Sequence, residues 1–143
     1  MGTFIELKAA DGFVFPAYVA QPAGTPKGGV VVLQEIFGVN SHIRAVADGY
    51  AAQGYLAVAP ATFHRVKPGV ELGYQPDDMT AGFGLKTAVE ALPAPGVLQD
   101  IPALAAEVRD GGGWMHCEPV QEMGKIRLDF RGVGVSGLST QAA

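Results

Sequence analysis

Residues 30–40, Val-Val-Val-Leu-Gln-Glu-Ile-Phe-Gly-Val-Asn, decide the fold of this chain. They form an apolar run, rich in β-branched residues, that ends in the carboxylate of Glu35 and a glycine turn. Such a run predicts a strand buried on both faces, as at the centre of a parallel sheet, and we expect residues 30–34 to be fully buried. Ligands of open α/β sheets bind beyond the carboxyl ends of the strands. Glu35 therefore has the position of a functional residue, and we expect it to be at least half buried and to face a concavity bordered by Phe37 and residues 60–76.

The segment before this strand predicts an antiparallel hairpin. Residues 3–8 and 13–20 are short strand-like runs, and the Ala-Asp-Gly sequence at residues 10–12 between them is a turn signal. We expect the hairpin to cover one edge of the sheet.

The segment after the strand predicts a helix and a second buried strand. Apolar residues recur at helical spacing over residues 41–53, with Asn40 or Ser41 as the N-cap, and residues 55–59 form the next apolar run. Two parallel strands joined through one helix make a right-handed crossover unit. The sequence therefore predicts an α/β fold.

Two further helices are predicted downstream. Residues 60–76 form a long irregular stretch at the carboxyl end of the second strand, where such folds carry their sites. Residues 77–91 fit a helix with Pro76 or Asp77 near its cap, and residues 97–109 fit a better amphipathic helix.

Composition excludes several classes of protein. The chain has 143 residues, 48% of them hydrophobic, which is enough for one domain with a real core. Ten basic residues against 14 acidic give a net charge of -4 without a basic stripe, so nucleic acid is not an expected partner. Apolar stretches are shorter than a membrane span and one cysteine cannot form an intrachain disulfide, so we expect no membrane partner and a cytoplasmic location.

The character of the sequence changes near residue 112. Helical and strand periodicity is clear over residues 1–112, whereas residues 113–143 contain only one short alternating run, within residues 125–130. We predict one α/β unit over 1–112 and a divergent, poorly packed tail over 113–143. The strand at 125–130 is expected to lie parallel beside the strand that begins at Val30.

A motif follows the valine-rich strand: Gln34-Glu35-Ile36-Phe37-Gly38-Val39-Asn40. Behind it come His42-Ile43-Arg44 and Gln53-Gly54-Tyr55. In these stretches the chain resembles the dienelactone hydrolase family. The resemblance extends to about Arg109. It implies a partial α/β-hydrolase fold, with an N-terminal hairpin and parallel strands joined by crossover helices. It also implies hydrolysis of small esters or lactones by a cysteine nucleophile, without a cofactor.

The resemblance implies roles for four residues. Glu35 would contact and help to activate the catalytic thiol, and the backbone N–H of Ile36 would supply half of the oxyanion hole. A rigid donor of this kind is worth roughly 3 to 4 kcal/mol of transition-state stabilisation. Phe37 and His64 would border the substrate.

The nucleophile of this chain is not evident. The family places it in a Gly-x-Cys-x-Gly-Gly elbow, where a strained turn requires glycines. Cys117 is flanked two residues away by Met115 and Pro119, and Ser136 follows Gly134 in a Gly-Val-Ser-Gly-Leu echo that lacks the closing glycine. Cys117 and Ser136 are therefore weak candidates, and neither the single cysteine nor its neighbour His116 has the spacing of a metal site.

Two hypotheses remain open. The chain is a hydrolase of small esters or lactones, in which Cys117 or Ser136 has been recruited as nucleophile. The alternative is a catalytically inactive copy, truncated or altered in reading frame near residue 109, with at most weak ligand or partner binding.

Overall fold

A computed structural model of the chain describes residues 1–93, 106, 116–117 and 137–138. The predicted helix over residues 97–109, apart from residue 106, and the predicted strand over residues 125–130 lie outside the described residues. So does most of the predicted tail.

The predicted hairpin is confirmed. β1 (Thr3–Lys8) and β2 (Val14–Ala20) pair antiparallel in a continuous register. At the turn between them, Gly12 has a φ of 86°, a left-handed conformation that glycine adopts without steric cost. The carboxylate of Asp11 accepts a hydrogen bond of 3.1 Å from the backbone N–H of Phe13 and closes the turn.

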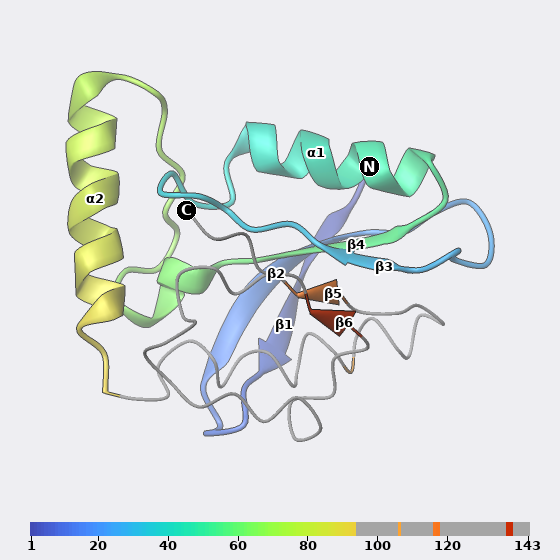
Figure 1. Cartoon of the computed structure of the whole chain (residues 1–143), viewed down its shortest axis with the longest axis horizontal. Helices are drawn as coiled ribbons and strands as arrows, with labels where there is room; N and C mark the ends of the chain where they lie inside the picture. The colour runs from blue at the N-terminus through green and yellow to red at the C-terminus, as the bar shows by residue number, and fades with distance from the viewer. Residues whose placement is uncertain (94–105, 107–115, 118–136, 139–143) are drawn as a thin grey trace.

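The crossover unit is also confirmed. β3 (Gly29–Val31) pairs parallel with β4 (Leu56–Pro60), and α1 (Ser41–Ala52) connects them across one face of the sheet (Figure 1). β2 pairs antiparallel with the other side of β4, so the strand order is β1-β2-β4-β3. The hairpin therefore covers one edge of the sheet, as expected.

The prediction that residues 30–34 are fully buried is wrong. Leu33 is 52% exposed and Val30 and Val31 are half-buried, whereas Val32 and Gln34 are buried. The physical reason is the position of β3, which is the outer strand of the four-stranded sheet in the described residues, so a strand of this sheet covers it on one side only. Leu33 lies beyond the end of β3. β4, which has a neighbour on each side, is buried along its whole length.

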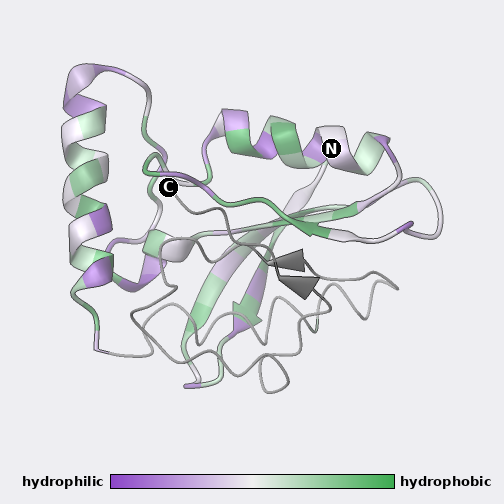
Figure 2. Cartoon of the chain, viewed as in Figure 1, coloured by the Kyte–Doolittle hydropathy of each residue, from purple (hydrophilic) through white to green (hydrophobic). Residues whose placement is uncertain are grey.

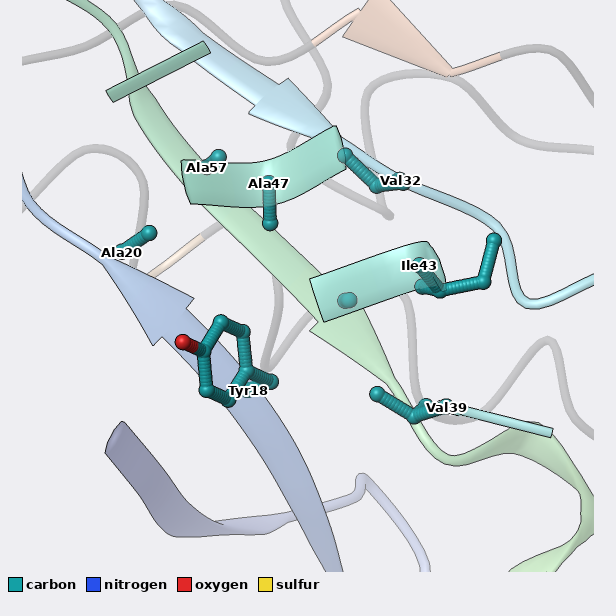
Figure 3. Packing of buried hydrophobic residues seen from close by; sticks show 8 residues of the cluster. Tyr18, Ala20, Val32, Val39, Ile43, Ala47 and Ala57 are labelled. Atoms are coloured by element: carbon teal, nitrogen blue, oxygen red, sulfur yellow. The ribbon is translucent and has the colours of Figure 1, made fainter. Parts of the chain in front are cut away.

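The helix α1 begins at an asparagine cap. The side-chain oxygen of Asn40 accepts a hydrogen bond of 3.1 Å from the N–H of Ile43, which satisfies one free donor of the first turn. Ile43 and Ala47 form the buried face of the helix. Figure 3 shows this face against the sheet, where the packed residues are Tyr18, Ala20, Val32, Val39, Ile43, Ala47, Ala57 and Ala59.

A second core cluster lies on the opposite face of the sheet, because side chains alternate along each strand. Its buried members are Ala9, Phe15, Ala17, Val19, Leu56 and Val58. In Figure 2, β2 and β3 are largely hydrophobic, whereas α1 and α2 alternate between hydrophobic and hydrophilic residues.

The segment after β4 forms a short 3-10 helix, η1 (Thr62–Arg65), and then an irregular run that leads to α2 (Pro76–Glu90). The N-cap of α2 is Gln75, one residue before Pro76 and two before Asp77, and its N–H donates a hydrogen bond of 3.1 Å to the carboxylate of Asp78. No helix of the described residues is both long and apolar enough to cross a bilayer.

Two short strands come from the later part of the chain. β5 (His116–Cys117) and β6 (Gly137–Leu138) pair parallel with each other, and Cα atoms of β5 lie within 8 Å of those of β3. The division of the chain into a unit over 1–112 and a tail over 113–143 stays a prediction.

Candidate active site

The turn that follows β3 has a backbone conformation that side chains rarely adopt. Glu35 has a φ of 56°, and it is the one residue other than glycine with a positive φ among the described residues. This region costs an ordinary L-residue about 1–2 kcal/mol. Such a conformation persists only where surrounding contacts hold it.

The side chain of Glu35 does not lie as predicted. It is exposed, and neither Glu35 nor Phe37 lines the cavity found near this turn, so the expectation of a carboxylate buried toward a concavity is wrong. The exposure of Glu35 continues the alternation of the residues before it, because Leu33 is exposed and Gln34 is buried.

The next residue, Ile36, presents a backbone donor that has no partner in the part of the chain that the structure describes. Ile36 is half-buried, and its N–H takes part in none of the backbone hydrogen bonds of the described residues. Its carbonyl faces α2 at Gly82, where an added Cβ would overlap the Ile36 oxygen and lie 3.1 Å from the Ile36 Cβ. Glycine at position 82 therefore lets α2 pack directly on the carbonyl group of Ile36.

A second glycine lets a loop approach the turn from another side. Gly38 has a φ of 81°, and an added Cβ would overlap the carbonyl oxygen of Val70. Beside this contact, the N–H of Leu72 donates a hydrogen bond of 2.8 Å to the carbonyl of Phe37, and Gly38 forms an isolated antiparallel bridge with Glu71. The turn is thus held by backbone contacts on both sides.

Side chains fasten the same loop to the start of α1. The amide nitrogen of Asn40 donates to the carbonyl of Leu72 at 3.1 Å and to the hydroxyl of Tyr74 at 3.3 Å. Arg44 pairs with the carboxylate of Glu71 at 2.8 Å and also donates to the carbonyl of Val39. These contacts fix the loop that borders the turn.

Gln34 is a structural residue of the site that sequence reasoning did not single out. It is 2% exposed, and its side-chain oxygen accepts a hydrogen bond of 3.0 Å from the N–H of Thr62. The bond joins the end of β3 to the start of η1. The signal in the sequence was a polar residue inside an apolar run, which is informative because buried polar groups need partners.

The structure does not bring Phe37 and His64 together. Phe37 packs on Tyr74, with ring centroids 4.6 Å apart. His64 lies in η1, half-buried, and lines a cavity of about 50 Å³ together with Gln34. His64 and Phe37 thus border different parts of the site, and a substrate contact for either residue stays a prediction.

The segment that carries His64 is fastened to the hairpin turn by a charged contact. Arg65 donates from both terminal nitrogens to the carboxylate of Asp11, at 2.8 and 3.1 Å, and stacks at 4.4 Å on the ring of Phe13. The hydrogen bonds from Arg65 hold the pKa of Asp11 below its usual value.

The candidate nucleophiles are described only in part. Cys117 lies in β5, close in backbone position to β3, and Ser136 lies outside the described residues. Among the described residues no cluster of three or more histidine, cysteine or acidic residues could hold a metal ion.

The sheet order, the crossover helix and the left-handed turn at the carboxyl end of β3 are those of a partial α/β-hydrolase fold. A family model for the dienelactone hydrolase family matches residues 15–109, which is more than half of the sequence. The chain belongs to the dienelactone hydrolase family, and the predicted resemblance is confirmed.

Relatives and solved structures agree with this assignment. A protein of Azospirillum brasilense named "Putative carboxymethylenebutenolidase" is 54% identical over 71 residues, which cover 49% of this chain and 31% of that protein. The carboxymethylenebutenolidase of Pseudomonas putida is 37% identical over 93 residues, covering 56% of this chain and 39% of the enzyme. The crystal structure of a "Putative Dienelactone Hydrolase" from Klebsiella pneumoniae superposes with a TM-score of 0.61 at 31% identity, covering 79% of this chain and 45% of that one. The chain thus spans about a third of the length of these two curated relatives.

Proposed function

We propose that residues 34–38 supply the oxyanion donor and the thiol-activating carboxylate of a site that hydrolyses small esters or lactones. The observation that carries the proposal is the left-handed backbone of Glu35, a strained conformation at a non-glycine residue. Strain of this kind is concentrated at functional sites, because selection for stability alone would favour glycine there. The Pseudomonas putida relative is named as a butenolidase, and a butenolide is a small lactone.

The N–H of Ile36 has the properties that an oxyanion donor needs. It has no partner among the described residues, and the contacts at Gly82 and Gly38 hold the backbone directly after it from two sides. A donor fixed in this way can be aimed at charge that develops only in the transition state, without a cost of reorganisation. Ile36 is in addition half-buried, which reduces competition from water.

Glu35 stands beside this donor as an exposed carboxylate. A carboxylate can hold or accept the proton of a thiol and so increase the fraction of reactive thiolate. The exposed position leaves Glu35 reachable by a thiol presented from a neighbouring element. We therefore assign to Glu35 the activation of the nucleophile and not the binding of substrate.

We further propose that the 143-residue chain has no efficient nucleophile of its own. The glycine pattern of a nucleophile elbow occurs around neither Cys117 nor Ser136. One observation favours the opposite view, in which Cys117 has been recruited: the backbone of β5 lies within 8 Å of β3, the strand that leads to Glu35.

A chimeric enzyme tests the role of the turn. The matched segment of the Pseudomonas putida enzyme is replaced by the corresponding segment of this chain, and hydrolysis of p-nitrophenyl acetate is measured. We expect saturable turnover that falls about a hundredfold or more in the Glu35→Gln variant of the chimera. A chimera that folds and binds substrate but is inactive, or is equally active with Glu35→Gln, would contradict the proposed role.

A further inference from the structure

The first residues of the chain are bound to α1 through a buried tyrosine and a carboxylate. The N–H of Gly2 donates to the hydroxyl of Tyr18 and to Oδ1 of Asp48, at 2.8 Å in each case. The Tyr18 hydroxyl donates in turn to the same carboxylate, at 3.0 and 3.2 Å. Figure 1 shows the N-terminus beside α1, the helix that carries Asp48. Segments from β2 and α1 thus meet at the nitrogen of Gly2.

The nitrogen of Gly2 has more acceptors than it has hydrogens. A peptide N–H has a single hydrogen, which the two oxygens must share. The hydrogen of the Tyr18 hydroxyl is engaged by Asp48, so toward Gly2 this hydroxyl can only accept. An ammonium group has three hydrogens and would give each oxygen its own charge-assisted hydrogen bond. The arrangement therefore suits a primary ammonium better than a peptide group.

The carboxylate of Asp48 has no cation beside it in the described residues. Asp48 is half-buried and takes part in none of their ion pairs. Arg44 lies one turn earlier on α1, but its guanidinium pairs with Glu71 at 2.8 Å. A half-buried carboxylate gains more from an opposite charge than an exposed one, because water screens the pair less. A cation at the nitrogen of Gly2 would supply the missing charge.

Packing requires glycine at position 2 and leaves Met1 in solvent. A Cβ at Gly2 would overlap the carbonyl oxygen of Val19 and lie 2.9 Å from the ring of Tyr18. Met1, in contrast, is fully exposed. Glycine is also among the small residues that allow a methionine aminopeptidase to remove the methionine before it. The residue that the packing requires is therefore one that allows Met1 to be removed.

We propose that the Met1–Gly2 bond is a processing site, and that its cleavage creates an ion pair between the new α-ammonium group of Gly2 and the carboxylate of Asp48. The aminopeptidase adds water across the peptide bond. The oxygen of the water enters the carboxylate of the released methionine, and both of its hydrogens end on the Gly2 nitrogen, which becomes an ammonium group. The ammonium donates to Asp48 and Tyr18 and so fastens β1 to α1. The inference does not depend on the proposed hydrolase function.

Two forms of the chain test the ion pair, one that starts at Met1 and one that starts at Gly2. Each is released from a fusion partner by a protease that leaves no extra residue. At about pH 6.5 the α-amino group of an unfolded chain is protonated, and there the Gly2 form should have an unfolding constant in urea about three- to tenfold smaller than the Met1 form. Equal stability of the two forms would overturn the proposal.

The pH dependence gives a second reading that needs no substitution. An anionic partner raises the pKa of an α-amino group, so the extra stability is present below the unfolded pKa and is lost as the pH rises through the folded pKa. The amino group of Gly2, followed by ¹⁵N NMR, should therefore lose its proton at a higher pH than that of Met1 in the other form. Titration of both groups at the same pH would contradict the ion pair.

Two variants assign the effect to Asp48. Asp48→Asn keeps an acceptor oxygen for Gly2 and Tyr18 but removes the charge, so the two forms should become equally stable. Asp77→Asn makes the same change at an exposed carboxylate of α2, and as the matched control it should leave the difference between the forms intact. A difference that persists in Asp48→Asn would overturn the assignment.

Intact-mass spectrometry tests the processing site itself. The 143-residue chain is expressed from Met1 in a bacterial host without a fusion partner. We expect the purified protein to be lighter than the full sequence by one methionine residue. A chain that retains Met1 would overturn the assignment of the Met1–Gly2 bond as a processing site.

Discussion

Two glycines of α2, Gly82 and Gly84, make a matched pair that tests how the proposed oxyanion turn is held. Both lie inside the helix, two residues apart. Gly82 is buried against Ile36, whereas Gly84 is exposed and has nothing within 4 Å of an added Cβ. Replacement by alanine should therefore have opposite consequences at the two positions.

The magnitudes follow from helix propensity and from the contact. Alanine in a helix interior is about 0.5–1 kcal/mol more favourable than glycine, and at Gly84 this gain should appear in full. At Gly82 the new Cβ would overlap a backbone oxygen of Ile36, which cannot rotate away as a flexible side chain could. Forcing such a shift costs about 1–3 kcal/mol. The propensity gain cancels between the variants, so Gly82→Ala should be about 1–3 kcal/mol less stable than Gly84→Ala.

Urea unfolding followed by circular dichroism measures this difference. A shift in free energy of 1 kcal/mol corresponds to about 2–8 °C in Tm over the relevant range of domain sizes, so thermal unfolding gives a second reading. The amide resonance of Ile36 should move in Gly82→Ala and stay in place in Gly84→Ala. If both variants are stabilised equally, α2 does not support the turn and our reasoning is refuted.

Three other predictions concern stability. Burial, and then the carboxylate of Asp48, raise the pKa of Tyr18. The contribution of Tyr18 to stability is therefore present below the pKa of unfolded tyrosine and is lost as the pH rises through the folded pKa. Tyr18→Phe should flatten the alkaline decline of the urea midpoint. Arg65 lowers the pKa of Asp11, so the contribution of Asp11 to stability is present above its unfolded pKa and is lost as the pH falls through its folded pKa. Asp11→Asn, which can still accept from a backbone N–H, should flatten the decline of the urea midpoint at acid pH. Gly38→Ala should lower the free energy of unfolding by more than Gly69→Ala. Both positions have a positive φ, but of the two only Gly38 lies against the backbone of Val70. Equal losses would show that the loop contact is not formed.

Local pattern was sufficient to predict most of the described fold. The hairpin followed from a turn signal between two apolar runs, and the parallel pair followed from two apolar runs joined by one helix. The exposure of Leu33 was not predictable in the same way, because composition alone does not say whether a strand lies at the centre or at the edge of a sheet.

Parts of the candidate site depend on contacts between distant segments, which periodicity does not reveal. By helix propensity alone Gly82 only weakens its helix, whereas in the fold it lets α2 approach Ile36 closely. The left-handed backbone of Glu35 is a conformation that ordinary residues rarely adopt, so periodicity gives no signal for it. The buried amide of Gln34 is explained only by its bond to Thr62, which lies beyond the next strand.

The most direct test of the central claim is the dependence of the hydrolysis rate on p-nitrophenyl acetate concentration for the purified 143-residue chain. A turn that supplies an oxyanion donor and a carboxylate cannot replace a missing nucleophile and base, because the members of a catalytic triad act as a unit. We predict a rate that rises linearly with substrate, as for surface nucleophiles, and that is unchanged in Cys117→Ala, Ser136→Ala and Glu35→Gln. Saturable turnover that disappears in Cys117→Ala or in Ser136→Ala would contradict the account and establish a complete hydrolase within this chain.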